Sequence, residues 1–171
     1  MKRLLIFVFL TFAMSAMRLV EAADWHHYIS ANLTSYHFNR DKNYNEVNPG
    51  LGYEGVYGSF RILGGAYYNS FKRWTGYALG GLVPLRLQVT QNSQLAAGLV
   101  LGAASGYQEV NLNNTSQKED KNNLGIIPVG GILLAWEPIK ARGIGINILV
   151  TPPLKKYDIS GFAGLQVKFS F

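Results

Sequence analysis

Cysteine is absent from this 171-residue sequence. Its absence excludes disulfide bonds, a lipid-modified cysteine, thiolate metal ligands and a cysteine nucleophile. Charge is also sparse, at 15% of the residues, and the 16 lysines and arginines are scattered along the chain rather than gathered into a basic stripe. We therefore expect no nucleic-acid partner.

Long apolar runs are missing after the N-terminal segment, so the rest of the chain lacks the roughly 20 consecutive apolar residues of a transmembrane helix. Residues 1–22 begin with Lys2 and Arg3, continue as an apolar stretch and end with small residues around Ala22. This pattern is typical of a secretory signal peptide, and we expect cleavage after Ala22. If the remaining domain, residues 23–171, enters a membrane, it does so with strands.

The last stretch of the chain, residues 159–171, alternates at period two and so predicts a strand with one apolar face. It ends with Phe171 on the apolar side, where the interfacial girdle of a membrane barrel has aromatic residues. A terminal aromatic residue after such alternation resembles the signal that the assembly machinery of bacterial outer-membrane barrels recognises. We expect this strand to close a ring against the first one.

Eight segments have strand character and are separated by polar or turn-forming stretches. They are residues 30–38, 50–56, 60–68, 74–85, 94–107, 124–136, 143–151 and 159–171. Residues 23–29 precede them as a short polar and aromatic lead. The connections alternate between short turns and longer polar loops, as in small membrane barrels. The sequence thus predicts an all-β protein, an eight-stranded antiparallel transmembrane β-barrel with an N-terminal signal peptide.

The segment 94–107 indicates what fills the barrel. One face carries Leu95 and Leu99 and the other carries Ala96 and Val100, so neither face is polar. A water-filled pore would have polar residues at alternate positions. Two interpretations remain: an apolar lumen that holds a hydrocarbon chain, or small residues that let a narrow barrel fill itself with side chains.

Three polar residues should meet at the rim that carries the longer loops: His37 at the end of the first strand, and Asn69 and Ser70 at the end of the third. A histidine within reach of a serine hydroxyl is the minimum for base-assisted acyl transfer, because the hydroxyl is a weak nucleophile until a base accepts its proton. The alternative is that these residues hydrogen-bond the loops. The neighbouring His26 and His27 point to opposite faces of a strand, so neither a metal nor another cofactor is expected.

A resemblance to a known family covers most of the mature chain. It is carried by the segments LTSYHFNRDKNYNEVNP, AYYNSFKRW and GIIPVGGILLAWEPIKARGIGINILVTPP, and by the aromatic C-terminal strand. These segments resemble the lipid A palmitoyltransferase family, known as PagP, most closely around residues 44–46 and 69–74. In that family a rim histidine, an aspartate and the following serine are essential. They match His37, Asn69 and Ser70, so Asn69 stands where the family has its aspartate.

The resemblance implies an outer-membrane acyltransferase that moves a fatty acyl chain, usually palmitoyl, from a phospholipid to lipid A. His37 is then the general base, Ser70 the nucleophile or a hydroxyl donor to the reacting carbonyl, and Asn69 the residue that orients one of them. By constant spacing from Ser70, the glycine that floors the family's acyl pocket falls on Gly81.

Pro128 and Pro152 correspond to prolines of the family and lie on neighbouring strands. Because proline removes a ladder donor, they are expected to leave an unpaired window through which a lipid enters sideways. The partners implied are phospholipid, lipid A or lipopolysaccharide, and the barrel assembly machinery through Phe171, for a monomer in the bacterial outer membrane. The alternative function is a non-catalytic small barrel with a lipid-binding, shielding or recognition role.

Overall fold

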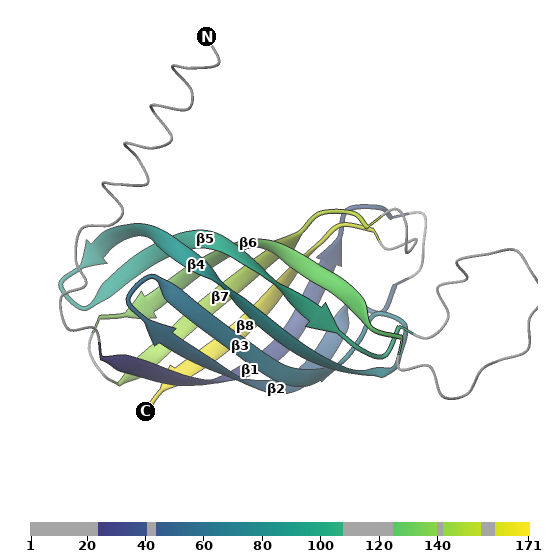
Figure 1. The fold of residues 1–171 in the computed structure, drawn as a ribbon, viewed down its shortest axis with the longest axis horizontal. Helices are drawn as coiled ribbons and strands as arrows, with labels where there is room; N and C mark the ends of the chain where they lie inside the picture. Colours follow the sequence, from purple (N-terminus) through teal and green to yellow (C-terminus); the bar gives the residue numbers. More distant parts are fainter. Residues whose placement is uncertain (1–23, 41–43, 108–124, 140–141, 155–159) are drawn as a thin grey trace, which may run out of the picture.

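The computed structural model describes residues 24–40, 44–107, 125–139, 142–154 and 160–171. These residues form eight strands that close into one barrel in chain order (Figure 1). The strands are β1 (Trp25–His37), β2 (Val47–Tyr57), β3 (Phe60–Tyr68), β4 (Trp74–Thr90), β5 (Ser93–Ala104), β6 (Ile127–Pro138), β7 (Gly143–Thr151) and β8 (Phe162–Ser170). Each pairs antiparallel with the next, and β8 pairs with β1. The predicted eight-stranded antiparallel barrel is therefore confirmed, whereas the expected signal peptide, residues 1–22, lies outside the described residues.

Strands β3 and β7 have the predicted bounds, and the other strands differ at their ends. The predicted lead at residues 23–29 is wrong from Trp25 onward, because residues 25–29 pair with the end of β2. Strand β4 continues to Thr90 instead of ending at Leu85, since its last residues pair with the start of β5. Polar and aromatic side chains at the strand ends had concealed this pairing in the sequence.

The outward face of the barrel is apolar on every strand. Exposed side chains include Ile29, Leu51, Ile62, Leu82, Leu99, Ile132, Ile148 and Phe169. Exposed aromatic residues gather toward both ends: Trp25, Tyr57, Phe60, Trp136 and Phe171 at the end where β8 stops, and Tyr36, Phe38, Phe71 and Trp74 at the other. No helix in the described parts of the chain is long and apolar enough to cross a membrane.

Four charged side chains fill the interior near the end where β8 stops. Glu54, Arg61, Glu137 and Lys168 are each at most 2% exposed. Arg61 contacts both carboxylates, and the Lys168 ammonium donates to Glu54 at 2.9 and 3.0 Å and to Glu137 at 3.2 Å. Buried charges require such pairing, and the partly exposed Arg86 lies a further 3.9 Å from Glu137. The sequence analysis did not predict this ion cluster.

Next to the ion cluster lies an apolar layer formed by several strands. Its buried members are Leu63, Leu79, Val83, Ala96, Val100, Leu133 and Ala135. Ala96 and Val100 are the inward face of β5, so the interior is apolar on that strand, as the sequence indicated. The apolar layer separates the ion cluster from the space beneath the longer loops.

Candidate functional site: a cavity beneath the longer loops

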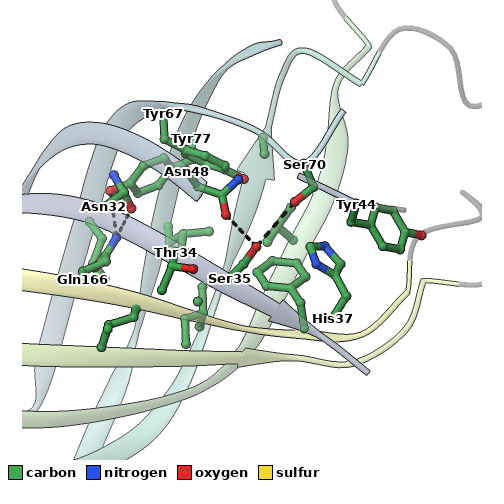
Figure 2. A pocket seen from close by; sticks show the side chains of 18 of the residues that line it. Asn32, Thr34, Ser35, His37, Tyr44, Asn48, Tyr67, Ser70, Tyr77 and Gln166 are labelled. Atoms are coloured by element: carbon green, nitrogen blue, oxygen red, sulfur yellow. Dashed lines mark hydrogen bonds between the residues drawn. The ribbon is translucent and has the colours of Figure 1, made fainter. Parts of the chain in front are cut away.

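A cavity occupies the barrel interior beneath the longer loops (Figure 2). The space inside it that is open to the centres of water-sized molecules is about 80 Å³. The apolar part of its wall comprises Leu63, Leu79, Ala104, Val129, Leu133, Leu149 and Leu165, and the polar part includes Asn32, Thr34, Ser35, His37, Asn48, Ser70 and Gln166. The cavity is therefore amphipathic, with polar groups mainly on β1, β2 and β8 and at its mouth.

Leucines rather than Gly81 form the floor of the cavity. Leu79 and Leu133 line the cavity and also belong to the apolar layer beneath it. Gly81 does not line the cavity and pairs with Arg61 at the level of the ion cluster. A Cβ atom on Gly81 would lie 2.1 Å from the Leu99 carbonyl oxygen, so this glycine serves the close approach of β4 and β5.

His37 ends β1 at the mouth of the cavity and is 4% exposed. Its ring stacks on Tyr44 with 4.1 Å between centroids and also contacts Phe162 at 5.7 Å. Its Nδ1 atom has no hydrogen-bond partner among the described residues. Two aromatic rings thus position the imidazole by packing, as Figure 2 shows for Tyr44, and leave this nitrogen free.

The carboxylate beside His37 is Glu46. Its Oε1 atom accepts a hydrogen bond from the His37 backbone N–H at 3.2 Å and lies 3.9 Å from His37 Nδ1. The Arg40 guanidinium pairs with the same oxygen. The hydrogen bond from the His37 N–H, together with Arg40, holds the pKa of Glu46 below its usual range. The sequence analysis found residues 44–46 similar to the family but did not assign a role to this carboxylate.

Ser70 is the freer of two neighbouring serine hydroxyls. Ser35 Oγ donates to Asn48 Oδ1 at 2.6 Å, and Asn48 is fixed because its Nδ2 donates to the Tyr68 carbonyl at 3.0 Å. Ser70 Oγ has a single contact among the described residues, at 3.5 Å to Ser35 Oγ. The proton of Ser35 is therefore committed to Asn48, so Ser70 is the donor in the contact between the two serines, and at 3.5 Å this bond is weak enough to give way to a substrate. Figure 2 shows Ser70 and His37 at the same mouth.

Asn69 lies next to Ser70 in the chain but does not line the cavity. Its Oδ1 accepts hydrogen bonds from the backbone N–H groups of Phe71 and Arg73 at 2.9 and 3.0 Å. Its Nδ2 donates to Thr75 Oγ1 at 2.9 Å and to the Gly106 carbonyl at 3.3 Å. These contacts build the β3–β4 turn. The side chain has no hydrogen bond to His37 or Ser70, so the predicted orienting role is not what this structure shows.

The ladder between β6 and β7 stops short of the longer loops. Its last pair is Ile132 with Val150, although β6 continues to Ile127 and remains paired with β5. Pro128 lies within the unpaired part of β6, and Pro152 follows directly after β7, which ends at Thr151; both prolines are exposed. Pro128 is therefore on the strand where the sequence analysis placed it, whereas Pro152 lies just beyond its strand, and both are beside a gap in the hydrogen bonding.

Fold and site together define a class of protein: a closed eight-stranded barrel with an apolar outer surface. The ion cluster fills one end of its interior, and an amphipathic cavity occupies the other end. Comparison with known proteins adds no family, because no protein-family model matches the chain and no curated protein matches it significantly.

Proposed function

We propose that this protein is an outer-membrane acyltransferase that moves a fatty acyl chain from a phospholipid to lipid A. The acyl chain occupies the cavity, and the ester carbonyl lies at the mouth beside His37 and Ser70. One observation carries the proposal: a buried imidazole and a weakly bonded serine hydroxyl share the mouth of a largely apolar cavity. The polar mouth and the largely apolar cavity together suit an amphipathic substrate.

The outer surface supports a location in a membrane. Apolar side chains are exposed on all eight strands, and exposed aromatic residues gather toward both ends. An apolar band flanked by two aromatic girdles is the outer surface of a transmembrane barrel. The signal peptide expected from residues 1–22 fits export to the bacterial outer membrane.

The chemistry begins with proton transfer to His37. The carboxylate of Glu46 favours the tautomer that carries its proton on Nδ1, which leaves Nε2 as the base. The Ser70 hydroxyl either attacks the ester carbonyl and gives its proton to His37, or donates a hydrogen bond to the carbonyl while His37 activates the lipid A hydroxyl. In both routes the phospholipid leaves as a lysophospholipid, and the acyl group forms a new ester with lipid A.

Lateral entry explains how a membrane lipid reaches the cavity. The unpaired stretch beside Pro128 and Pro152 lies on the β6 and β7 side of the barrel. Unpaired backbone groups facing lipid are costly, so such a stretch needs a use. We assign it the role of the route by which an acyl chain slides in.

A non-catalytic lipid-binding barrel is the second candidate. It is favoured by the 3.9 Å between His37 Nδ1 and Glu46, which is longer than a hydrogen bond. Mass spectrometry of lipid A from bacteria with and without the protein distinguishes the two. The acyltransferase adds one acyl chain, and a barrel that only binds lipid leaves the lipid A masses unchanged.

A further inference from the structure

Deep in the cavity, three polar side chains form a cluster away from the reactive mouth. Gln166 Nε2 donates to Asn32 Oδ1 at 2.6 Å and to the Tyr77 hydroxyl at 3.2 Å. All three residues line the cavity, and Figure 2 shows Asn32 and Gln166 facing each other there. A plain hydrocarbon chain in the cavity offers no hydrogen-bonding group to this polar cluster.

The ion cluster fixes the orientation of each amide in this group. The Glu54 carboxylate accepts from Lys168, so it is an acceptor and requires the NH₂ group of Asn147 to face it, at 2.7 Å. The same Asn147 nitrogen lies 3.3 Å from Gln166 Oε1. The Nε2 atom of Gln166 is therefore directed to Asn32. Asn32 must in turn face this donor with its Oδ1 atom.

Two donors are left over in the cavity wall. Asn32 Nδ2 is buried and has no hydrogen-bond partner among the described residues. The Tyr77 hydroxyl uses its oxygen to accept from Gln166, and its own proton has no hydrogen-bond acceptor within the described part of the chain. Asn32 Oδ1 and the Tyr77 hydroxyl oxygen both accept from the one Gln166 nitrogen, which places the two side chains next to each other, and we infer that their free donors can converge on a single acceptor. An unpaired buried donor is costly unless a ligand satisfies it.

The barrel makes room for Tyr77 at this position. A Cβ atom on Gly52 would lie 2.5 Å from the Tyr77 hydroxyl oxygen, and one on Gly65 would lie 3.0 Å from it. Two inward-facing glycines on β2 and β3 therefore let the ring carry its hydroxyl to the cluster. The polar group in the cavity is thus built into the packing of neighbouring strands.

We propose that Asn32 and Tyr77 form a second polar subsite, which binds an oxygen atom carried along the hydrocarbon chain of the ligand. The inference rests on the proposed function and specifies its substrate class as acyl chains with a hydroxyl or keto oxygen. Asn32 precedes His37 by five residues on β1. At ~3.3 Å per residue and a tilt of ~40°, and with one residue taken up by the bulge at Leu33, the subsite lies about 10 Å below the mouth. It therefore selects an oxygen well along the chain.

The test measures binding of uncharged C16 methyl esters to the purified mature barrel in detergent, comparing the plain ester with isomers that carry one hydroxyl at successive positions. We expect one mid-chain isomer to bind about tenfold more tightly than the plain ester, as one or two added hydrogen bonds allow. Asn32→Leu and Tyr77→Phe should each reduce this preference several-fold and retain binding of the plain ester.

Tyr67→Phe is the matched control, since Tyr67 also lines the cavity but its hydroxyl already pairs with Tyr107 at 3.0 Å. It should keep the preference. Equal affinity for every isomer, or a preference that survives in both Asn32→Leu and Tyr77→Phe, overturns the subsite while leaving the acyl cavity in place. Failure of all esters to bind overturns the proposed function together with the subsite.

Discussion

Arg61 and Glu137 are joined across the barrel interior by two parallel hydrogen bonds, each 2.9 Å long, between strands that are not neighbours. Such a two-pronged pair fixes both the distance and the angle between β3 and β6. With Glu54 and Lys168 it blocks the end of the interior near the β8 terminus. The cavity is therefore closed toward the end where β8 stops, and its mouth lies beneath the longer loops.

The first prediction concerns this ion cluster. Arg61→Met should destabilise the barrel by about 3–5 kcal/mol, because it leaves two buried carboxylates with the Lys168 ammonium and the partly exposed Arg86, which lies 3.9 Å from Glu137, as their only cations among the described residues. The measurement is the free energy of unfolding in detergent against urea. Arg40→Met is the control, since Arg40 is 58% exposed in its side chain and its pair with Glu46 should contribute at most about 1 kcal/mol. Equal effects of the two substitutions would contradict the account of the cluster.

The barrel itself was predictable because alternation and turn residues are local signals. Phe169 lies outward and Lys168 inward on β8, as the period-two pattern indicated. The ion cluster was not predictable, because its members lie far apart in the chain and meet only after closure. Only the closed ring reveals that Lys168 approaches Glu54, a residue 114 positions away.

The candidate site was predicted in part. His37 and Ser70 do share the mouth of the cavity, because strand parity puts the ends of the first and third strands at one rim. The partner carboxylate was missed, since Glu46 reaches His37 through the turn geometry between β1 and β2. Constant spacing also failed to identify the cavity floor at Gly81, because the direction and packing of each inward residue depend on barrel closure.

The second prediction concerns Glu46. The pKa of Glu46 is lowered in the folded state. The contacts of Glu46 therefore stabilise the fold at a pH above the unfolded carboxyl pKa of ~4.3. This stabilisation is lost as the pH falls through the folded pKa. NMR titration should place the Glu46 pKa below the ordinary range. In Arg40→Ala the pKa of Glu46 should rise only part of the way to its ordinary value, because the hydrogen bond from the His37 backbone N–H remains. An ordinary pKa in the intact protein would contradict the contact.

Charge at Glu46 should also matter for transfer. Glu46→Gln keeps an acceptor for the His37 N–H but removes the charge near Nδ1, so acyl transfer should fall at least about tenfold; the analogous loss in a serine protease triad costs about 10⁴ in turnover. Unchanged transfer in a folded Glu46→Gln barrel would show that His37 works without this carboxylate.

The third prediction concerns Asn69→Asp, which restores the residue found in the family that the chain resembles. The carboxylate can keep both backbone N–H donors, and Thr75 can reverse its hydroxyl to donate, but the Gly106 carbonyl then faces a negative charge. We expect slightly lower stability, about 1 kcal/mol, and no gain in transfer. A clear rise in transfer would mean that position 69 turns toward His37 or Ser70 during the reaction.

The fourth prediction concerns the cavity floor. Leu133→Ala should deepen the cavity, cost about 2–5 kcal/mol of stability and shift the bound acyl chain to a longer one. The outward neighbour Leu134 is 42% exposed, so Leu134→Ala should leave chain length unchanged. Gly81→Met should impair folding instead of shortening the chain, because its Cβ would collide with the β5 backbone. Mass spectrometry of lipid that co-purifies with each variant measures the chain length.

The fifth prediction tests the central claim, acyl transfer at the mouth of the cavity. Lipid A is isolated from bacteria that produce the wild-type protein, His37→Ala, Ser70→Ala or Ser35→Ala, with the barrel in each confirmed as folded by its faster gel migration before heating. The account predicts one added acyl chain in lipid A for the wild type, none for His37→Ala or Ser70→Ala, and retained transfer for Ser35→Ala, whose hydroxyl is already committed to Asn48. An unmodified lipid A in wild-type cells, or full transfer in His37→Ala, would contradict it.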